Sequence, residues 1–155
     1  VADAQNVVDT LKYYAGLYRL DRKVPMPVKA AARLTSNVLF SARLFPYIAE
    51  VLVAGYEEIG ASVYKIDLFG SLTEEKFVST GSGSPIAYGI LENEFKDGVN
   101  VAQGVELAMK AVLAATKRNI GTGDGFDVAV IDKEGYREFS DDEKNRLLTQ
   151  ISGRS

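Results

Sequence analysis

Residues 80–85 read Thr80-Gly81-Ser82-Gly83-Ser84-Pro85, between an apolar run at 76–78 and a helix-like run at 86–91. Two glycines spaced two apart allow a tight turn with positive φ, and the neighbouring serines place small hydroxyls at the end of a strand. Such a junction suits a bound ligand or a catalytic hydroxyl. These residues alone leave open a phosphate cradle, a catalytic group and a plain helix cap.

Composition narrows the chemistry that this junction can perform. The 155 residues contain no histidine and no cysteine, which excludes Ser-His-Asp and Cys-His nucleophiles and every imidazole or thiolate metal site within the chain. Hydroxyl, amine and carboxylate chemistry remains. A phosphate cradle is disfavoured, because a P-loop has a lysine directly after its glycines and this chain has Ser84 and Pro85 there.

Length, charge and hydropathy lead us to expect a single domain in the cytoplasm. At 155 residues and 46% hydrophobic content, the chain fits one domain spanning residues 1–155. Its net charge of −3 comes without a basic stripe, so nucleic-acid binding has no electrostatic support. No apolar run approaches the roughly 20 residues of a membrane helix, and no signal peptide is visible. We therefore expect no membrane partner.

Hydrophobic periodicity predicts two helices and three strands before the junction. Val7, Leu11, Tyr14 and Leu17 recur at helical spacing, and Pro27 suits the first position of a second helix that Pro46 ends. Two strand-like runs on either side of a turn-like segment indicate a hairpin. The predicted elements are helices at about 3–20 and 27–45, and strands at about 51–55, 62–68 and 75–79.

The second half predicts two helices, a hairpin and a last helix. Ser84 is expected to cap a short helix, Asn100 and Gln103 are spaced as a capping box, and Ser140 with Glu143 repeats that spacing. The predicted elements are helices at about 85–93, 101–118 and from 141 on, with strands at about 126–131 and 136–139. This order is typical of an α+β protein with helices packed on antiparallel sheets.

Together these pieces resemble the β-type subunits of the proteasome core particle, most closely the archaeal kind. The resemblance covers nearly the whole chain. It implies a four-layer α/β/β/α sandwich of the N-terminal nucleophile hydrolase type. It rests on Asp3-Ala4-Gln5, Leu17-Tyr18-Arg19-Leu20, Met26-Pro27, Ser36-Asn37, Pro46-Tyr47, Leu52-Val53-Ala54-Gly55, Ser79 to Pro85 with Tyr88-Gly89, Gly104-Val105 and Asp127-Val128-Ala129-Val130-Ile131.

The family's nucleophile is a threonine at the mature N-terminus, whose hydroxyl attacks the scissile carbonyl while its own α-amine takes the proton. By the resemblance, Val1 corresponds to a point just after the family's oxyanion-hole glycine. The resemblance therefore implies that the opening strands and the threonine lie upstream of Val1. We expect the chain to be a partial domain, or a short variant whose sheets another chain completes.

Three positions of the family's active site fall inside the sequence. Ser82 matches the serine that positions the threonine amine and relays its proton. Asn119 stands where the family has an aspartate, and Thr122 where it has a serine. Asparagine lacks the charge that would stabilise a nearby ammonium. All three residues could instead be turn formers bonded to local backbone.

Two further positions are implied to touch substrate. Val1 would line the pocket for the side chain before the cut, and Asp67 would reach the neighbouring subunit's substrate cleft. Each also has a purely structural reading, Val1 as a buried strand residue and Asp67 as a solvated strand charge.

The function implied is that of a threonine-type endopeptidase subunit that degrades unfolded polypeptides. Asn119 keeps open the alternative of a non-catalytic β-ring subunit with a structural and assembly role. The implied partners are other β-type subunits in a seven-membered ring, α-type ring subunits and the unfolded polypeptide substrate. No cofactor and no metal are implied.

Overall fold

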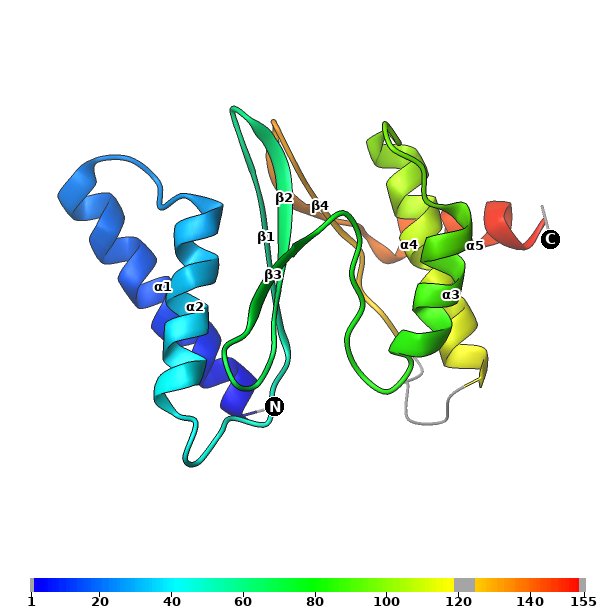
Figure 1. Ribbon diagram of the computed structural model, residues 1–155. Helices are drawn as coiled ribbons and strands as arrows, with labels where there is room; N and C mark the ends of the chain where they lie inside the picture. Colours follow the sequence, from blue (N-terminus) through cyan, green and yellow to red (C-terminus); the bar gives the residue numbers. More distant parts are fainter. Residues whose placement is uncertain (1, 119–124, 154–155) are drawn as a thin grey trace. The chain divides into compact units, whose positions relative to one another are not determined.

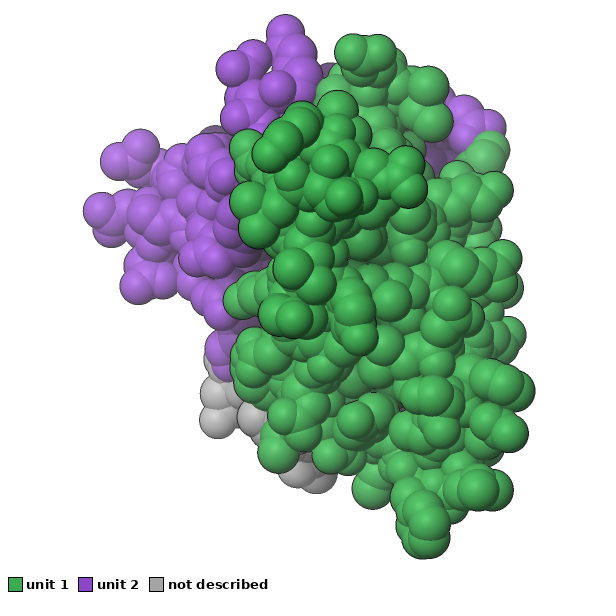
Figure 2. Space-filling model, turned by 90° about the vertical axis from the view of Figure 1, so that its left-hand side faces the viewer, with its two compact units in different colours: residues 1–78 green, residues 79–155 purple. Residues whose placement is uncertain are grey.

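The computed structural model describes residues 2–118 and 125–153. In these ranges two helices and three strands are followed by two helices, two strands and a helix, the predicted order (Figure 1). The chain divides into two compact units, residues 1–78 and 79–155 (Figure 2). One domain over 1–155 stays a prediction. None of the helices in the described ranges has the length and apolar character needed to cross a membrane.

Unit 1 is a helix pair against an antiparallel sheet (Figure 1). The sheet order is β1-β2-β3, with Val51 opposite Ile66 and Ile66 opposite Leu72. Helix α2 contacts all three strands and also packs on α1, so helices do cover an antiparallel sheet as predicted. The elements are α1 (Ala2–Arg22), α2 (Val28–Ser41), β1 (Val51–Glu57), β2 (Gly60–Ile66) and β3 (Leu72–Glu75).

The core of unit 1 forms where α2 meets the sheet. The helix buries one face at steps of three, one and three residues, through Ala32, Thr35, Ser36 and Leu39. Helix α2 can pack closely on β1 because Gly55 of β1 has no side chain. A Cβ at Gly55 would collide with the side chain of Val28, the first residue of α2. The buried hydrophobic cluster of this core comprises Val7, Ala32, Leu39, Val53, Tyr64 and Ile66.

Unit 2 is built around its longest helix, α4. Helices α3 and α5 both contact α4, and β4 pairs with β5 in an antiparallel hairpin. The elements are α3 (Ser84–Glu94), α4 (Val101–Arg118), β4 (Ala129–Asp132), β5 (Gly135–Glu138) and α5 (Asp141–Ser152). Its buried cluster is Val105, Met109 and Ile151, with Leu113, Phe126, Val128, Val130, Phe139, Leu147 and Leu148 packed against it.

Two of the three predicted caps are confirmed. The amide of Gln103 donates to the Asn100 side chain and the amide of Asn100 donates to the Gln103 side chain, both at 2.9 Å. Ser140 and Glu143 form the same reciprocal box at the start of α5. The prediction for Ser84 is wrong, because Gly83 is the N-cap of α3 and Ser84 already lies in its first turn, beside Pro85.

The third strand differs from the prediction at about 75–79. It spans Leu72–Glu75 and pairs with Val63–Ile66 of β2. The tight turn after β2 sets this register, since the Asp67 amide donates to the Ser71 carbonyl at 3.1 Å and the Gly70 amide to the Asp67 carbonyl at 3.0 Å. Two other elements also differ from their predicted bounds. Helix α2 ends at Ser41, before the predicted end at about 45, and β4 begins at Ala129, after the predicted start at about 126.

Replacing Ser140 with alanine should lower the free energy of unfolding by about 1 kcal/mol, because its hydroxyl accepts the Glu143 amide at the start of α5. Urea denaturation of the chain measures the effect. Ser84→Ala is the matched control, since α3 has no side-chain cap hydrogen bond. A loss of the same size for both variants would contradict this account of the cap.

Candidate active site

A pocket of about 230 Å³ lies at the glycine-serine junction of unit 2. Residues 79–83 form one side of it, and Ala87 of α3 with Val112 and Ala115 of α4 form the other. The helices thus contribute an apolar wall, while Ser79, Thr80 and Ser82 contribute hydroxyl groups.

The backbone turns at Gly81. This residue has φ of +91°, in the region that favours glycine, and its carbonyl accepts the Ser84 amide at 3.0 Å. The Gly83 carbonyl then accepts the amides of Ile86 and Ala87 at 3.1 and 3.2 Å, which starts α3. The predicted tight turn is confirmed, and it presents Ser82 between its two glycines.

Ser82 is the exposed hydroxyl of this pocket. Within the described ranges its hydroxyl forms no hydrogen bond, so it can both donate and accept one from a ligand or a neighbouring amine. Ser79 and Thr80 beside it are half-buried. The same part of the chain holds no group of three Asp or Glu side chains close enough to bind a metal ion. The polar side chains that line the pocket are the hydroxyls of Ser79, Thr80 and Ser82.

Of the other predicted site residues, the structure describes Asp67 alone. Val1, Asn119 and Thr122 lie outside the described residues. Asp67 belongs to unit 1, where its Oδ1 accepts the amides of Phe69 and Ser71, both at 2.9 Å. Asp67 therefore shapes the turn between β2 and β3, and its contact with substrate stays a prediction.

The sequence did not link the helix side of the pocket to the junction. Val112 and Ala115 lie three residues apart in α4, a spacing typical of the apolar face of any helix. Ala87 of α3 and Ala115 of α4 are each 5% exposed, and the two helices pack on each other. That contact depends on tertiary packing, so no local pattern could have assigned these alanines to a site.

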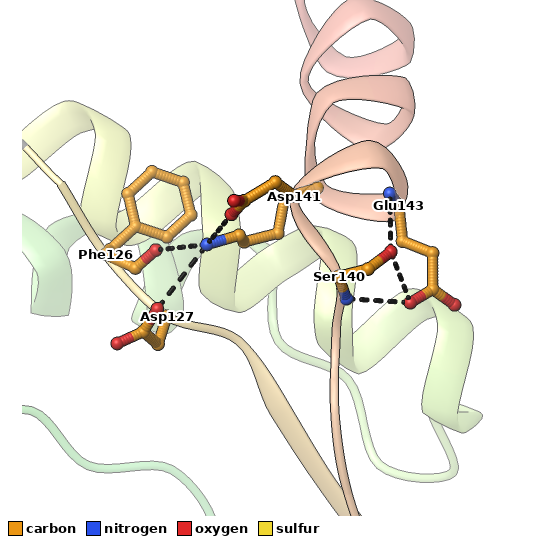
Figure 3. A network of polar contacts seen from close by, with 6 residues as sticks. Phe126, Asp127, Ser140, Asp141 and Glu143 are labelled. Atoms are coloured by element: carbon orange, nitrogen blue, oxygen red, sulfur yellow. Dashed lines mark hydrogen bonds and ion pairs between the residues drawn. The ribbon is translucent and has the colours of Figure 1, made fainter.

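A second polar network joins α5 to the chain before β4. The amine of Lys144 donates to the Phe126 carbonyl at 3.2 Å and to carboxylate oxygens of Asp127 and Asp141 at 3.4 and 2.9 Å. Figure 3 shows these three acceptors around one amine, with the Ser140–Glu143 box beside them. Arg137 of β5 pairs with Glu143 at 2.9 Å.

These contacts stabilise the charged forms of the groups involved. The hydrogen bond from Lys144 lowers the pKa of Asp141, and the same bond raises the pKa of Lys144. The Ser140 backbone amide lowers the pKa of Glu143. Asp141 and Glu143 sit in the first turn of α5, where negative charge is favourable to the helix dipole.

Comparison with known proteins identifies the family. Residues 1–131 match the model of the family described as "Proteasome subunit". The chain is 43% identical over 148 residues to "Proteasome subunit beta 2" of Nitrosopumilus maritimus, covering 96% of this chain and 70% of that protein. It is 45% identical over 148 residues to the protein of the same name in Cenarchaeum symbiosum, with the same coverage. It is 44% identical over 151 residues to "Proteasome subunit beta 1" of Thermococcus sibiricus, covering 97% and 72%. The glycine-serine junction and the elements around it are thus those of a known family, and the chain belongs to the proteasome subunits of the β type.

Proposed function

We propose that this chain is a subunit of a threonine-type endopeptidase that cuts unfolded polypeptides inside a ring assembly in the cytoplasm. The observation that carries the proposal is the exposed Ser82 hydroxyl in the junction pocket, in a chain 43–45% identical to proteasome β subunits. The absence of histidine and cysteine from the sequence fits a mechanism that uses hydroxyl and amine groups alone.

In the proposed reaction, an N-terminal threonine hydroxyl attacks the scissile carbonyl and its proton passes to the threonine α-amine. The amine then gives this proton to the leaving amine as the peptide C–N bond breaks, and water hydrolyses the resulting threonine ester to release the carboxylic acid and restore the hydroxyl. Ser82 holds the α-amine by a hydrogen bond, for which its hydroxyl, without a bond to any residue that the structure describes, is suited. Thr122 supplies a second hydroxyl and Asn119 an amide. Val1 lines the pocket for the substrate side chain, and Asp67 reaches the neighbouring subunit's cleft.

The proposed architecture is the four-layer sandwich of N-terminal nucleophile hydrolases, in a seven-membered β ring that adjoins α-type rings. Two features support it. Helix α2 covers the β1-β2-β3 sheet, and the β4-β5 hairpin leads directly into α5.

A second candidate function is that of a non-catalytic β-ring subunit with a structural and assembly role. Asn119 favours it, because an uncharged amide cannot stabilise a nearby ammonium as a carboxylate would. Intact-mass measurement and N-terminal sequencing of the subunit in its particle separate the two. A processed N-terminal threonine together with turnover of a peptide substrate supports the endopeptidase.

Replacing Asn119 with aspartate should raise peptide hydrolysis by the assembled particle about tenfold, because a restored carboxylate would stabilise the charged α-amine. The initial rate with a fluorogenic peptide measures the change. Gln103→Glu is the control, since it adds the same charge at an exposed helix cap and should leave the rate within twofold. Equal rates for the unsubstituted and Asn119→Asp particles would contradict the role given to this position.

A further inference from the structure

A groove of about 510 Å³ lies in unit 1 between α1, α2 and β1. Apolar side chains from these elements and from the chain before α2 line it, among them Leu11, Met26 and Val53. Among the described residues that line the groove, none carries a carboxylate. A concave apolar surface of this kind is suited to receive an apolar side chain from another segment.

Gly16 lies in the interior of α1 and lines the groove. A glycine inside a helix makes that helix less stable than an alanine would. Packing in unit 1 does not require the glycine. Apart from its chain neighbours and the backbone of α1, no heavy atom lies within 4 Å of where a Cβ at Gly16 would stand. Gly16 therefore leaves open space in the groove, where another backbone can approach α1 closely.

Two cationic side chains, Lys12 and Arg19, line the groove from α1; we call them the basic pair. They are seven residues apart, so they lie on one face of the helix, separated by about 10 Å along its axis. Both residues are exposed, and neither forms an ion pair with a residue in 2–118 or 125–153. An apolar side chain flanked by carboxylates would complement this surface in both polarity and charge.

The turn between β1 and β2, residues 57–59, carries such a set of side chains; we call it the hairpin turn. Glu57 ends β1, and Glu58 and Ile59 connect it to Gly60, the first residue of β2. Ile59 is 95% exposed, and neither glutamate forms an ion pair with a described residue. Figure 1 shows the hairpin turn at the free end of the two strands, at the top of unit 1.

The hairpin turn cannot enter the groove of its own chain. Ala54 of β1 lines the groove, and it is three residues from Glu57, about 10 Å along the strand. Because β1 is paired with β2 along its whole length, from Val51 to Glu57, this separation is fixed. Contact between the two surfaces therefore requires a second copy.

We propose that the hairpin turn of one copy of this chain docks in the groove of a second copy. Ile59 enters the groove beside Gly16, and the two glutamates of the hairpin turn pair with the basic pair. The proposal rests on the association of copies in the proposed ring. Because the hairpin turn and the groove are different surfaces of each copy, the contact is heterologous and can repeat from copy to copy around a ring.

Exchange of charges across the contact tests the proposal in the full-length subunit. Reversal of the basic pair (Lys12→Glu with Arg19→Glu), or of the turn (Glu57→Lys with Glu58→Lys), should raise the Kd between copies at least tenfold, because like charges then face each other. All four substitutions in one chain should return the Kd to within threefold of the unsubstituted value. Sedimentation velocity over a concentration series measures these constants.

Two further variants separate docking from general effects of charge and folding. Lys29→Glu with Arg33→Glu makes the same charge change on exposed residues of α2 that do not line the groove, and it should leave the Kd within twofold. Gly16→Leu fills the groove with a good helix former. It should raise the Kd about tenfold while Tm stays at or above that of the unsubstituted chain.

A Kd unchanged by either reversal, or no recovery in the fourfold variant, would overturn the proposal. The second result is the one expected if another kind of subunit, or another segment of the polypeptide, occupied the groove. Failure of the proposed function would look different. A subunit that hydrolyses no peptide but responds to charge exchange as described would refute the endopeptidase and support the contact, whereas unsubstituted copies that do not associate would refute both the ring and the contact.

Discussion

Replacing Gly70 with alanine should lower the free energy of unfolding of this chain by about 4 kcal/mol. Gly70 has φ of +84°, and a Cβ at this position would lie 2.5 Å from the Ser36 carbonyl oxygen and 3.0 Å from Cβ of Phe40. Both neighbours belong to α2, and the Ser36 hydroxyl also donates to the Gly70 carbonyl, so a shift of α2 away from the new Cβ would break that hydrogen bond. A chain of this size should lose roughly 10 °C in Tm.

Thermal unfolding followed by circular dichroism measures this loss, and Gly60→Ala separates its two causes. Gly60 also has positive φ, +115°, but no heavy atom lies within 4 Å of where its Cβ would stand. Its replacement should cost only the backbone strain, about 1–2 kcal/mol. Equal losses at the two positions would show that the contact between the β2–β3 turn and α2 has no energetic weight.

Replacing Ser82 with alanine should lower kcat for peptide hydrolysis about 100-fold. This is the lower end of the rate loss expected when a side chain that transfers a proton in the reaction is removed. The exposed hydroxyl of Ser82 lines the junction pocket and forms no hydrogen bond within the described ranges, so removing it breaks no contact seen there. KM should stay within twofold and Tm within about 2 °C. Steady-state kinetics of the assembled particle, with its melting curve, gives all three quantities.

Ser84→Ala provides the comparison for Ser82. Ser84 is two residues away, lies in the first turn of α3 and does not line the pocket. Its replacement should leave kcat within twofold. The role given to Ser82 would be refuted if Ser82→Ala kept more than half of the activity, or if both serine variants lost activity equally.

The tight turn at the glycine-serine junction was predictable because it depends on the residue types at a few consecutive positions. Glycines spaced two apart allow a tight turn with positive φ, and Gly81 does adopt positive φ, whereas Gly83 has φ of −88°. The boxes at Asn100–Gln103 and Ser140–Glu143 were found for the same reason, since each bonds residues three apart. Ser84 was assigned wrongly as a cap because Gly83 and Ser84 are both acceptable there and sequence spacing alone does not choose between them.

The sequence by itself determined the helices, both hairpins and the placement of Ser82 at a turn between a strand-rich and a helix-rich segment. These follow from periodicity, capping and glycine conformation, which act over a few residues. Only the tertiary structure decided three contacts. Ala115 of α4 lines the pocket, Gly70 lies against α2, and the Lys144 amine donates to the Phe126 carbonyl. Each of these depends on a contact between residues 18 or more positions apart in the chain, and no local pattern encodes which distant partner packing will choose.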